Sequence, residues 1–178
     1  MPGKRGSIGI PLCLGSYELL PFWYAVWTSL GFAVHTSPVS TRGLYLAGQA
    51  TIPSDTACFP AKLSHGHIKA LSQMQLDAIF YPCLTYNVDE GLGDNHYNCP
   101  VVAYYPEVLA GNCPELEGKK FIYDYVGIHR PKDFVHKMAK EVLPKYFGGI
   151  SEREVQAAAD AAYAEYEAHM AKLRVKGS

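Results

Sequence analysis

The sequence has almost no excess of charge of either sign. Its 16 basic and 17 acidic residues are spread along the chain and give a formal net charge of -1. Such a chain offers neither the basic surface that a phosphate backbone requires nor an acidic tail. We therefore expect no nucleic-acid partner.

The sequence also lacks an apolar run long enough to span a bilayer. Residues 19–30 form its densest apolar stretch, but Pro21 and several polar residues interrupt it. Lys4 and Arg5 make the start of the chain positive, yet no apolar segment of the kind found in a secretory signal follows them. These absences predict a cytoplasmic protein with no membrane partner.

Two further absences concern chemistry. The chain contains no Gly-x-x-x-x-Gly-Lys-Ser/Thr motif and no Asp-x-Gly phosphate loop near its start, so we predict no ATPase activity. It contains no Cys-x-x-Cys pair, which excludes the zinc-ribbon signature.

Its five cysteines are odd in number and irregularly spaced, unlike the disulfide framework of a small secreted domain. In a reducing compartment, cysteines near turns are more often metal ligands or reactive thiols.

Short apolar runs alternate with longer apolar or amphipathic segments along the 178 residues, of which 48% are hydrophobic. The strands that we expect are 7–14, 32–36 and 76–82, then a fourth strand or extended segment at 100–105 and a further strand at 121–126. The helices that we expect are 19–30, 42–48, 61–73, 131–142 and 151–178. A polar, glycine-bearing loop at 84–98 separates two of these segments, and loops of that length are often functional.

This order of elements predicts an α/β protein with a Rossmann-like, three-layer domain, a mostly parallel sheet of about four strands and a long C-terminal helix. We expect a single domain over residues 1–178, with an α/β core in 1–150 and the helix in 151–178, and a fragment of a larger multidomain chain is compatible with it. Trp23 and Trp27, four residues apart on the first helix, belong to a core stripe.

The last helix carries its own start signal. Ser151 and Glu154 fit the capping box, in which each side chain bonds the backbone N–H of the other residue. Apolar residues recur from Val155 to Leu173 at three- and four-residue steps. That stripe is expected to pack either on the domain's own sheet or on a partner.

Three cysteines stand where elements begin or end. Cys83 follows the third expected strand, and ligands of open α/β sheets bind beyond the carboxyl ends of strands. Cys58 precedes an expected helix, whose free backbone donors favour a thiolate. Cys99 ends the long loop, directly before the expected fourth strand. If parallel strands that follow one another are neighbours, the three sulfurs can converge at one edge of the sheet.

Three thiolates suit a soft metal, and spacing alone leaves several sites open. An iron-sulfur cluster with one non-cysteine position is one, and a zinc completed by His65, His67 or His96 is another. Cys58 and Cys83 could instead form a redox switch through a reversible disulfide. The three could also be buried small hydrophobes, which is how we interpret Cys13 and Cys113.

Polar neighbours of these cysteines have two interpretations each. Ser54 and Asp55 could cap the helix after Cys58 or orient a cluster ligand, and capping is the simpler role. Asn95 and Asn98 could donate hydrogen bonds to cluster sulfurs or satisfy loop backbone. His65 could support the metal site, but a hydrogen-bonded helix residue is the more common role.

Three strings resemble one family closely. They are Thr51-Ile-Pro-Ser-Asp-Thr-Ala-Cys-Phe-Pro-Ala-Lys-Leu-Ser-His-Gly-His-Ile, Ile79-Phe-Tyr-Pro-Cys and Asp94-Asn-His-Tyr-Asn-Cys-Pro-Val-Val-Ala-Tyr-Tyr-Pro-Glu-Val. With the opening Ile8-Gly-Ile-Pro, the resemblance covers almost the whole chain. The chain resembles the acyl-CoA dehydratase activase-related family, which is related to 2-hydroxyglutaryl-CoA dehydratase and to CoA-substrate-specific enzyme activases.

The resemblance implies a cofactor, partners and a chemistry. Cys58, Cys83 and Cys99 match cluster ligands of the related dehydratase domains, which implies a 4Fe-4S cluster, with zinc as the alternative. ATP-dependent activase or dehydratase modules are the implied partners, in cis or in trans, acyl-CoA is the implied ligand, and a homo-oligomer is compatible. In the full assembly the chemistry implied is low-potential electron transfer or the lyase reaction of a 2-hydroxyacyl-CoA dehydratase. A non-catalytic interaction domain is the rival hypothesis.

Overall fold

The fold is built on one parallel sheet. The computed structural model describes residues 3–89, 91 and 93–177. Its strands are β1 (Ser7–Ile10), β2 (Ala33–Thr36), β3 (Ala78–Phe80) and β4 (Phe121–Ile122), in the spatial order β2-β1-β3-β4. Every pair is parallel, with Ile8 of β1 opposite Val34 of β2 and Ala78 of β3. The α/β class and the parallel sheet expected from the sequence are confirmed.

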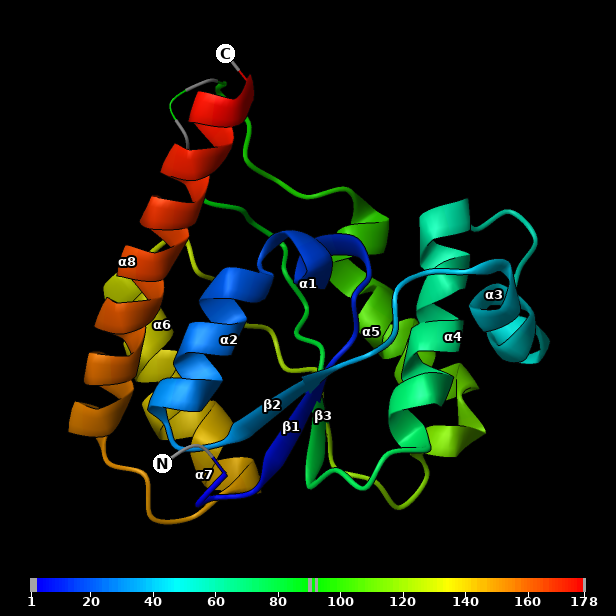
Figure 1. The fold of residues 1–178 in the computed structure, drawn as a ribbon, viewed down its shortest axis with the longest axis horizontal. Coiled ribbons are helices and arrows are strands. Elements are labelled where there is room, and N and C mark those ends of the chain that lie inside the picture. Colours follow the sequence, from blue (N-terminus) through cyan, green and yellow to red (C-terminus); the bar gives the residue numbers. More distant parts are fainter. Residues whose placement is uncertain (1–2, 90, 92, 178) are drawn as a thin grey trace.

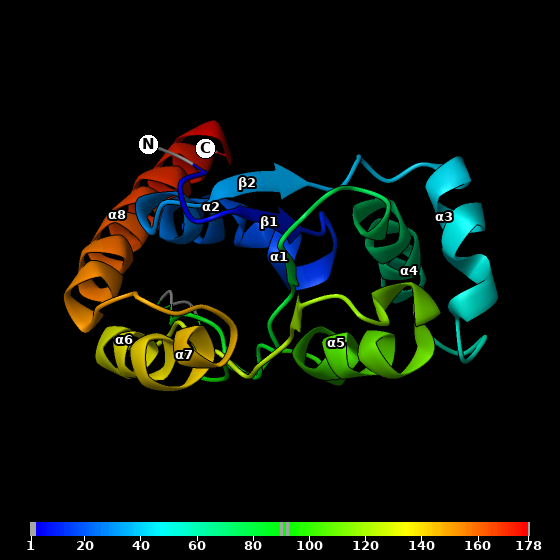
Figure 2. The same ribbon diagram turned by 90° about the horizontal axis from the view of Figure 1, so that it is seen from below.

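Helices cover both faces of the sheet, which makes three layers (Figures 1 and 2). They are α1 (Leu14–Glu18), α2 (Leu20–Ser29), α3 (Arg42–Gly48), α4 (Phe59–Ser72), α5 (Pro100–Asn112), α6 (Pro131–Lys137), α7 (Leu143–Tyr146) and α8 (Glu152–Gly177), with the short turns η1 (Gln49–Thr51), η2 (Pro114–Leu116) and η3 (Met138–Val142). On one face lie α2, α6, α7 and α8, and on the other lie α3, α4 and α5 (Figure 2). Within the described ranges, no helix is long and apolar enough to cross a membrane.

The larger core lies between the sheet and α2. Trp23 and Trp27 are fully buried there, and both pack edge-on against Phe80 of β3 at ring-centroid distances of 4.8 and 5.0 Å. The core stripe expected from these two tryptophans is confirmed. Burial of aromatic side chains of this size is the main stabilising term for such a domain.

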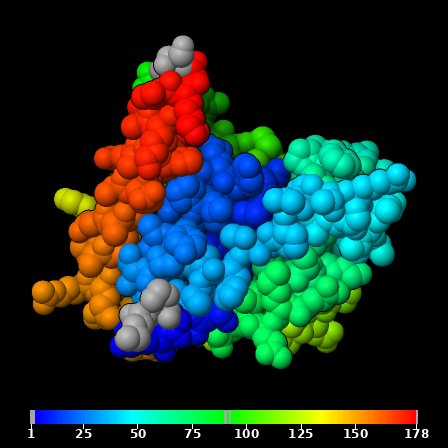
Figure 3. Space-filling view, in the orientation of Figure 1, coloured from blue at the N-terminus to red at the C-terminus, as the bar shows by residue number. Residues whose placement is uncertain are grey.

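The long helix α8 closes this core from outside. Ser151 and Glu154 form the expected capping box, with Ser151 N–H donating to Glu154 Oε2 at 2.9 Å and Glu154 N–H donating to Ser151 Oγ at 3.3 Å. The buried residues of the apolar stripe, from Val155 to Tyr166, pack along α2, whereas Leu173 is 48% exposed. In Figure 3 the surface of α8, orange to red, lies directly beside the blue surface of the N-terminal part of the chain. Most of the stripe is therefore covered by this chain itself.

The segment that we expected to begin a fourth strand, residues 100–105, is instead the start of α5, so that prediction was wrong. Cys99 caps the helix, and Pro100 occupies its first position, where the missing N–H costs nothing. The buried residues Tyr105 and Leu109 then pack in one core cluster with residues of α4 and β3. The fourth strand is Phe121–Ile122, the run that the sequence offered as a further strand.

The helix expected at 131–142 continues beyond its predicted end. After α6 the chain widens into the π turn η3 and then forms α7. Pro144 lies in the first turn of α7, where it cannot donate a backbone hydrogen bond. A local π turn accommodates such a proline without ending the helix.

Candidate functional site at the carboxyl edge of the sheet

The strand order places a switch point between β1 and β3. From β1 the chain moves to β2 on one side, and it returns through α4 to β3 on the other. Ligands of open α/β sheets bind in the crevice beyond the carboxyl ends of such strands. The candidate site is therefore the edge where β1 and β3 end and α4 and α5 begin (Figure 1).

Cys83 lies at this edge, just beyond β3. Its N–H donates to Asp124 O at 3.1 Å, and its carbonyl oxygen accepts from Val126 N–H at 3.2 Å, so it extends the pairing of β3 with β4. Its side chain is buried. Burial raises the pKa of the Cys83 thiol to about 12, and the charges of Glu107 and Asp124 act in the same direction, while a hydrogen bond from the Glu107 backbone partly opposes them. This thiol is protonated at neutral pH.

Cys58 is the N-cap residue of α4 and is exposed. The sequence favoured Ser54 or Asp55 as the cap, and that prediction was wrong. Ser54 Oγ accepts from Thr56 N–H at 3.2 Å, and Asp55 offers its carbonyl oxygen to Lys62 Nζ at 2.6 Å. These bonds close the turn before Cys58 and leave its thiol facing solvent.

Cys99 is the N-cap residue of α5 and is also exposed, so it precedes a helix and not the strand that we expected. Its Sγ accepts from Val102 N–H at 3.5 Å. Beside it, Asn98 Nδ2 donates to Leu84 O at 2.9 Å and Asn95 Oδ1 accepts from Tyr97 N–H at 3.1 Å. The two asparagines thus satisfy loop backbone, the simpler of their two predicted roles.

The three cysteines reach the same edge from three different elements, and all five cysteines of the chain are unpaired. Two of the three, Cys58 and Cys99, are exposed at helix N-termini, and the third, Cys83, is buried. Three thiols fit a soft metal or a cluster in their donor chemistry. Across residues 3–89, 91 and 93–177, however, no three His, Cys, Asp or Glu side chains are grouped closely enough to hold a metal ion.

His65 lies in a buried hydrogen-bond network on the inner face of α4. Thr51 Oγ1 donates to Gly48 O at 3.0 Å, so its interaction with His65 Nδ1 at 2.8 Å makes the imidazole the donor. His65 Nε2 then accepts from the Tyr105 hydroxyl at 2.9 Å. Cys113 Sγ lies 3.5 Å from Nδ1. The ring is neutral with both nitrogens occupied, which supports the structural role over a metal-binding one.

His67 joins the ends of two strands. Its Nδ1 lies 2.7 Å from Ser37 Oγ and its Nε2 lies 2.9 Å from Ser40 Oγ. Ser37 Oγ also accepts from Leu12 N–H at 2.8 Å. Since Ser37 accepts there, its own proton is available for Nδ1, and Nε2–H then donates to Ser40. The third histidine considered for zinc, His96, lies 3.4 Å from Asp89 Oδ1.

The two buried histidines predict a marked loss of stability in mild acid. Burial lowers the pKa of His65 and of His67 from 6.5 to about 4. Between these values the unfolded chain binds protons that the folded chain does not, so acidification favours unfolding. Going from pH 7 to pH 5, each histidine is expected to lower the free energy of unfolding by about 2 kcal/mol.

Urea unfolding at pH 7 and pH 5 measures this loss. His65→Gln should remove about half of the difference between the two pH values, because one of the two titrating groups is gone. An equal pH dependence in the variant and the parent chain would show that His65 does not titrate in this window.

Several residues at this edge carried no sequence signal. Tyr125 pairs with Cys83 across β3 and β4, and its hydroxyl donates to Glu107 Oε1 at 2.7 Å. That hydrogen bond is the main reason why the pKa of Tyr125 is raised to about 12. Thr51 and Tyr105 enter the His65 network from η1 and α5. Only the fold brings these residues together, because their partners lie far away in sequence.

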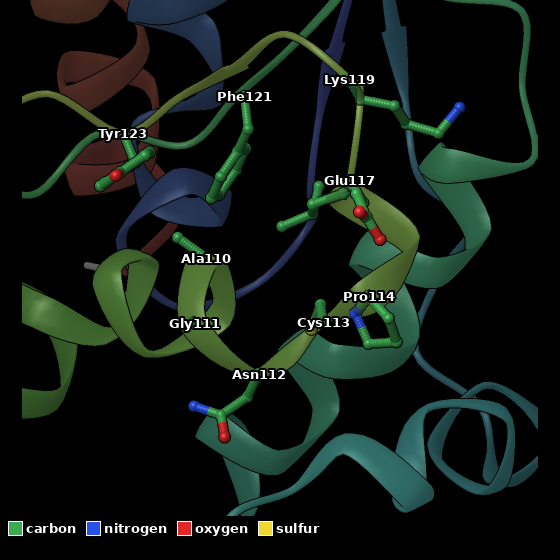
Figure 4. A pocket seen from close by; sticks show the side chains of 10 residues that line it. Ala110, Gly111, Asn112, Cys113, Pro114, Glu117, Lys119, Phe121 and Tyr123 are labelled. Atoms are coloured by element: carbon green, nitrogen blue, oxygen red, sulfur yellow. The ribbon is translucent and has the colours of Figure 1, made fainter.

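A cavity of about 610 Å³ lies elsewhere, between the C-terminal end of α5 and the edge strand β4 (Figure 4). Phe121, Tyr123, Glu117 and Lys119 line it, and Cys113 is the one cysteine that it reaches. In Figure 1, α5 begins at the carboxyl edge and runs back along the sheet, so its C-terminal end lies away from the switch point. This cavity is therefore not part of the candidate site.

Comparison with known proteins gives one match. No curated protein and no solved structure matches the chain. A family model described as "CoA enzyme activase uncharacterised domain" matches residues 7–178, which is nearly the whole sequence and includes the three cysteines of the candidate site. The chain therefore belongs to this CoA enzyme activase-related family.

Proposed function

We propose that the chain holds an iron-sulfur cluster, of the 4Fe-4S type, through Cys58, Cys83 and Cys99. The observation that carries this proposal is the arrival of three unpaired cysteines at one sheet edge, from the end of β3 and from the starts of α4 and α5. A cluster bound by three cysteines supplies a one-electron carrier with one iron open to another ligand. The family membership supports a place beside CoA-dependent enzymes.

The three cysteines differ in burial, and therefore in what each needs before it can bind such a group. Cys58 and Cys99 are the exposed N-cap residues of α4 and α5. Cys83 is buried and protonated, so its proton must leave before it can act as a ligand. The charge of the Glu107 carboxylate, which accepts from the Tyr125 hydroxyl, adds to the burial that raises the pKa of Cys83.

The proposed role in the assembly is low-potential electron transfer, or radical dehydration of an acyl-CoA, together with ATP-dependent activase or dehydratase modules. An activase-related domain is consistent with partners of this general kind. The chain carries no nucleotide-binding motif of its own, so ATP hydrolysis is assigned to the partner.

Cluster content is the direct test of the proposed site. After anaerobic reconstitution, we expect about four irons and four sulfides per chain and a reduced-state paramagnetic resonance signal. Cys58→Ser, Cys83→Ser and Cys99→Ser should each lose most of both. Cys113→Ser is the matched control, because Cys113 is a buried, unpaired cysteine outside the site, and it should load like the parent chain.

Circular dichroism on every variant separates lost ligation from lost fold. Cys58 and Cys99 are exposed, so their serine variants should fold normally. Iron and sulfide loading that survives in the Cys58 and Cys99 variants would overturn the assignment of the ligands. A parent chain that takes up neither iron nor sulfide while folded would overturn the cluster itself.

A second candidate function is a non-catalytic interaction domain with a structural zinc or no metal. One observation favours it: exposed aromatic side chains surround the cysteines at the carboxyl edge. They are Tyr17, Phe59, Tyr97, Tyr104 and Tyr125. Exposed aromatic residues of this kind are enriched in protein interfaces. Stoichiometric zinc, or no metal, in the anaerobic preparation would favour this function.

A further inference from the structure

A second cavity, of about 360 Å³, opens beyond the carboxyl ends of β1 and β2, beside the switch point. Leu12, Leu14 and Tyr17 line it from the segment that follows β1, Val39 and Ser40 line it from the segment that follows β2, and Leu63 lines it from α4. Ligand sites of open α/β sheets lie at this position, and a volume of a few hundred cubic ångströms is typical of them. Its place and size are those of a small-molecule site.

The wall formed after β1 is held in a strained backbone conformation. Leu14 has a φ of 44°, and among the residues that the structure describes it is the only one other than glycine with a positive φ. A leucine in this region costs free energy, and such strain is found mostly at sites where the surrounding structure enforces it for a purpose. Here it turns the chain from β1 into α1, so that Leu14 and Tyr17 border the cavity.

The opposite wall of the cavity, formed by the segment after β2, is held by hydrogen bonds between His67 and two serines. Ser37 Oγ accepts from Leu12 N–H and contacts His67 Nδ1, while Ser40 Oγ contacts His67 Nε2. Two hydrogen-bonded serines and a fully buried histidine thus tie the ends of β1 and β2 to α4. The cavity is therefore a preformed space, because its walls are held by side chains that lie behind it.

The lining selects for an uncharged, aliphatic ligand. The described residues that line the cavity include no charged side chain. The Ser40 hydroxyl is uncharged, and its oxygen accepts from His67 Nε2–H. The Cys13 thiol, also in the lining, stays neutral because burial raises its pKa to about 12. The rest of the lining consists of leucine, valine and proline side chains and of Tyr17, and covering the methylene groups of a ligand with this largely apolar surface is favourable.

We propose that this cavity binds a short, uncharged aliphatic chain of a small-molecule ligand. Pro60 also lines it, and Cys58 lies two residues earlier at the same helix N-terminus. The binding itself requires no cluster, so it can be tested on the metal-free chain and stands apart from the proposed function.

A homologous series of straight-chain amides tests the chemistry of the ligand. Butanamide, pentanamide and hexanamide are titrated into the metal-free chain labelled at leucine and valine methyl groups. We expect saturable shifts confined to Leu12, Leu14, Val39 and Leu63, and an affinity that rises about four-fold with each added methylene. Absence of saturation for all three amides, or shifts centred on the cavity between α5 and β4, would overturn the proposal.

Val39→Trp tests the location. Val39 is 70% exposed at the rim, so an indole there should block the cavity without disturbing the core. We expect hexanamide affinity to fall at least ten-fold. Val175→Trp is the matched control, since Val175 is 77% exposed on α8, and its affinity should be unchanged. Equal affinity in the Val39→Trp variant and the parent chain would place the ligand elsewhere.

Discussion

Gly66→Ala is expected to lower the free energy of unfolding by about 3 kcal/mol, because α3 and α4 cross with their backbones in contact. A Cβ atom on Gly66 would lie 2.1 Å from the carbonyl oxygen of Leu44 and 2.8 Å from its carbonyl carbon. A Cβ atom on Gly48 would likewise lie 2.2 Å from Gly66 N. Neither contact can be relieved by rotating a side chain, so the two helices must move apart.

Gly111→Ala is the matched control for this substitution. Gly111 also lies within a helix, α5, but a Cβ atom there would meet nothing within 4 Å. Alanine is a better helix former than glycine, so Gly111→Ala should raise the free energy of unfolding by about 0.5–1 kcal/mol. Equilibrium unfolding in urea measures both variants. If they changed stability alike, α3 would not lie against α4 as described.

The same substitution reaches the candidate site indirectly. The segment after α3 runs through η1, which supplies Thr51 to the His65 network, and then to Cys58. Moving α3 away from α4 therefore disturbs the turn that presents the Cys58 thiol. In a Gly66→Ala chain that still folds, we infer weaker retention of the proposed cluster than in the Gly111→Ala chain.

The alternation of strands and helices could be predicted because each element has its own local pattern. The exception, residues 100–105, shows where local pattern fails. Val101, Val102 and Tyr104 are residue types enriched in strands. The Cys99 cap, the proline at the first helical position and the packing of Tyr105 and Leu109 against α4 outweigh that preference. Only the last of these depends on tertiary structure, and it cannot be seen in the sequence.

The candidate site, too, could be predicted from the sequence only in part. The positions of Cys58 and Cys83 at the ends of elements follow from local signals, a proline after one and a strand before the other. The surroundings of Cys83 do not, because Glu107 and Tyr125 arrive from α5 and from beyond β4. The partners of His65 and His67 are likewise set by the crossing of α3 and α4 and by the strand order.

Trp27→Ala is expected to have the largest effect on stability, a loss of about 3–5 kcal/mol in the free energy of unfolding. The Trp27 ring is fully buried between the sheet and its flanking helices, at 5.2 Å from Phe32, 5.0 Å from Phe80 and 6.1 Å from Phe147. These partners come from three separate parts of the chain, so they cannot close together over the space left by an indole. The loss is comparable with the whole stability of many domains of this size.

Tyr24→Ala is the control on the same helix, because Tyr24 is an aromatic residue of α2 that is 51% exposed. It should change the free energy of unfolding by less than about 1 kcal/mol. Far-ultraviolet circular dichroism is the suitable readout, since the substitution at Trp27 also removes a fluorophore. Similar losses in both variants would mean that α2 does not present Trp27 to the core. A large loss in Trp27→Ala alone would show that the core between α2 and the sheet stabilises the strands that position the candidate site. Phe80, which contacts Trp27, lies on β3, and β3 borders the switch point.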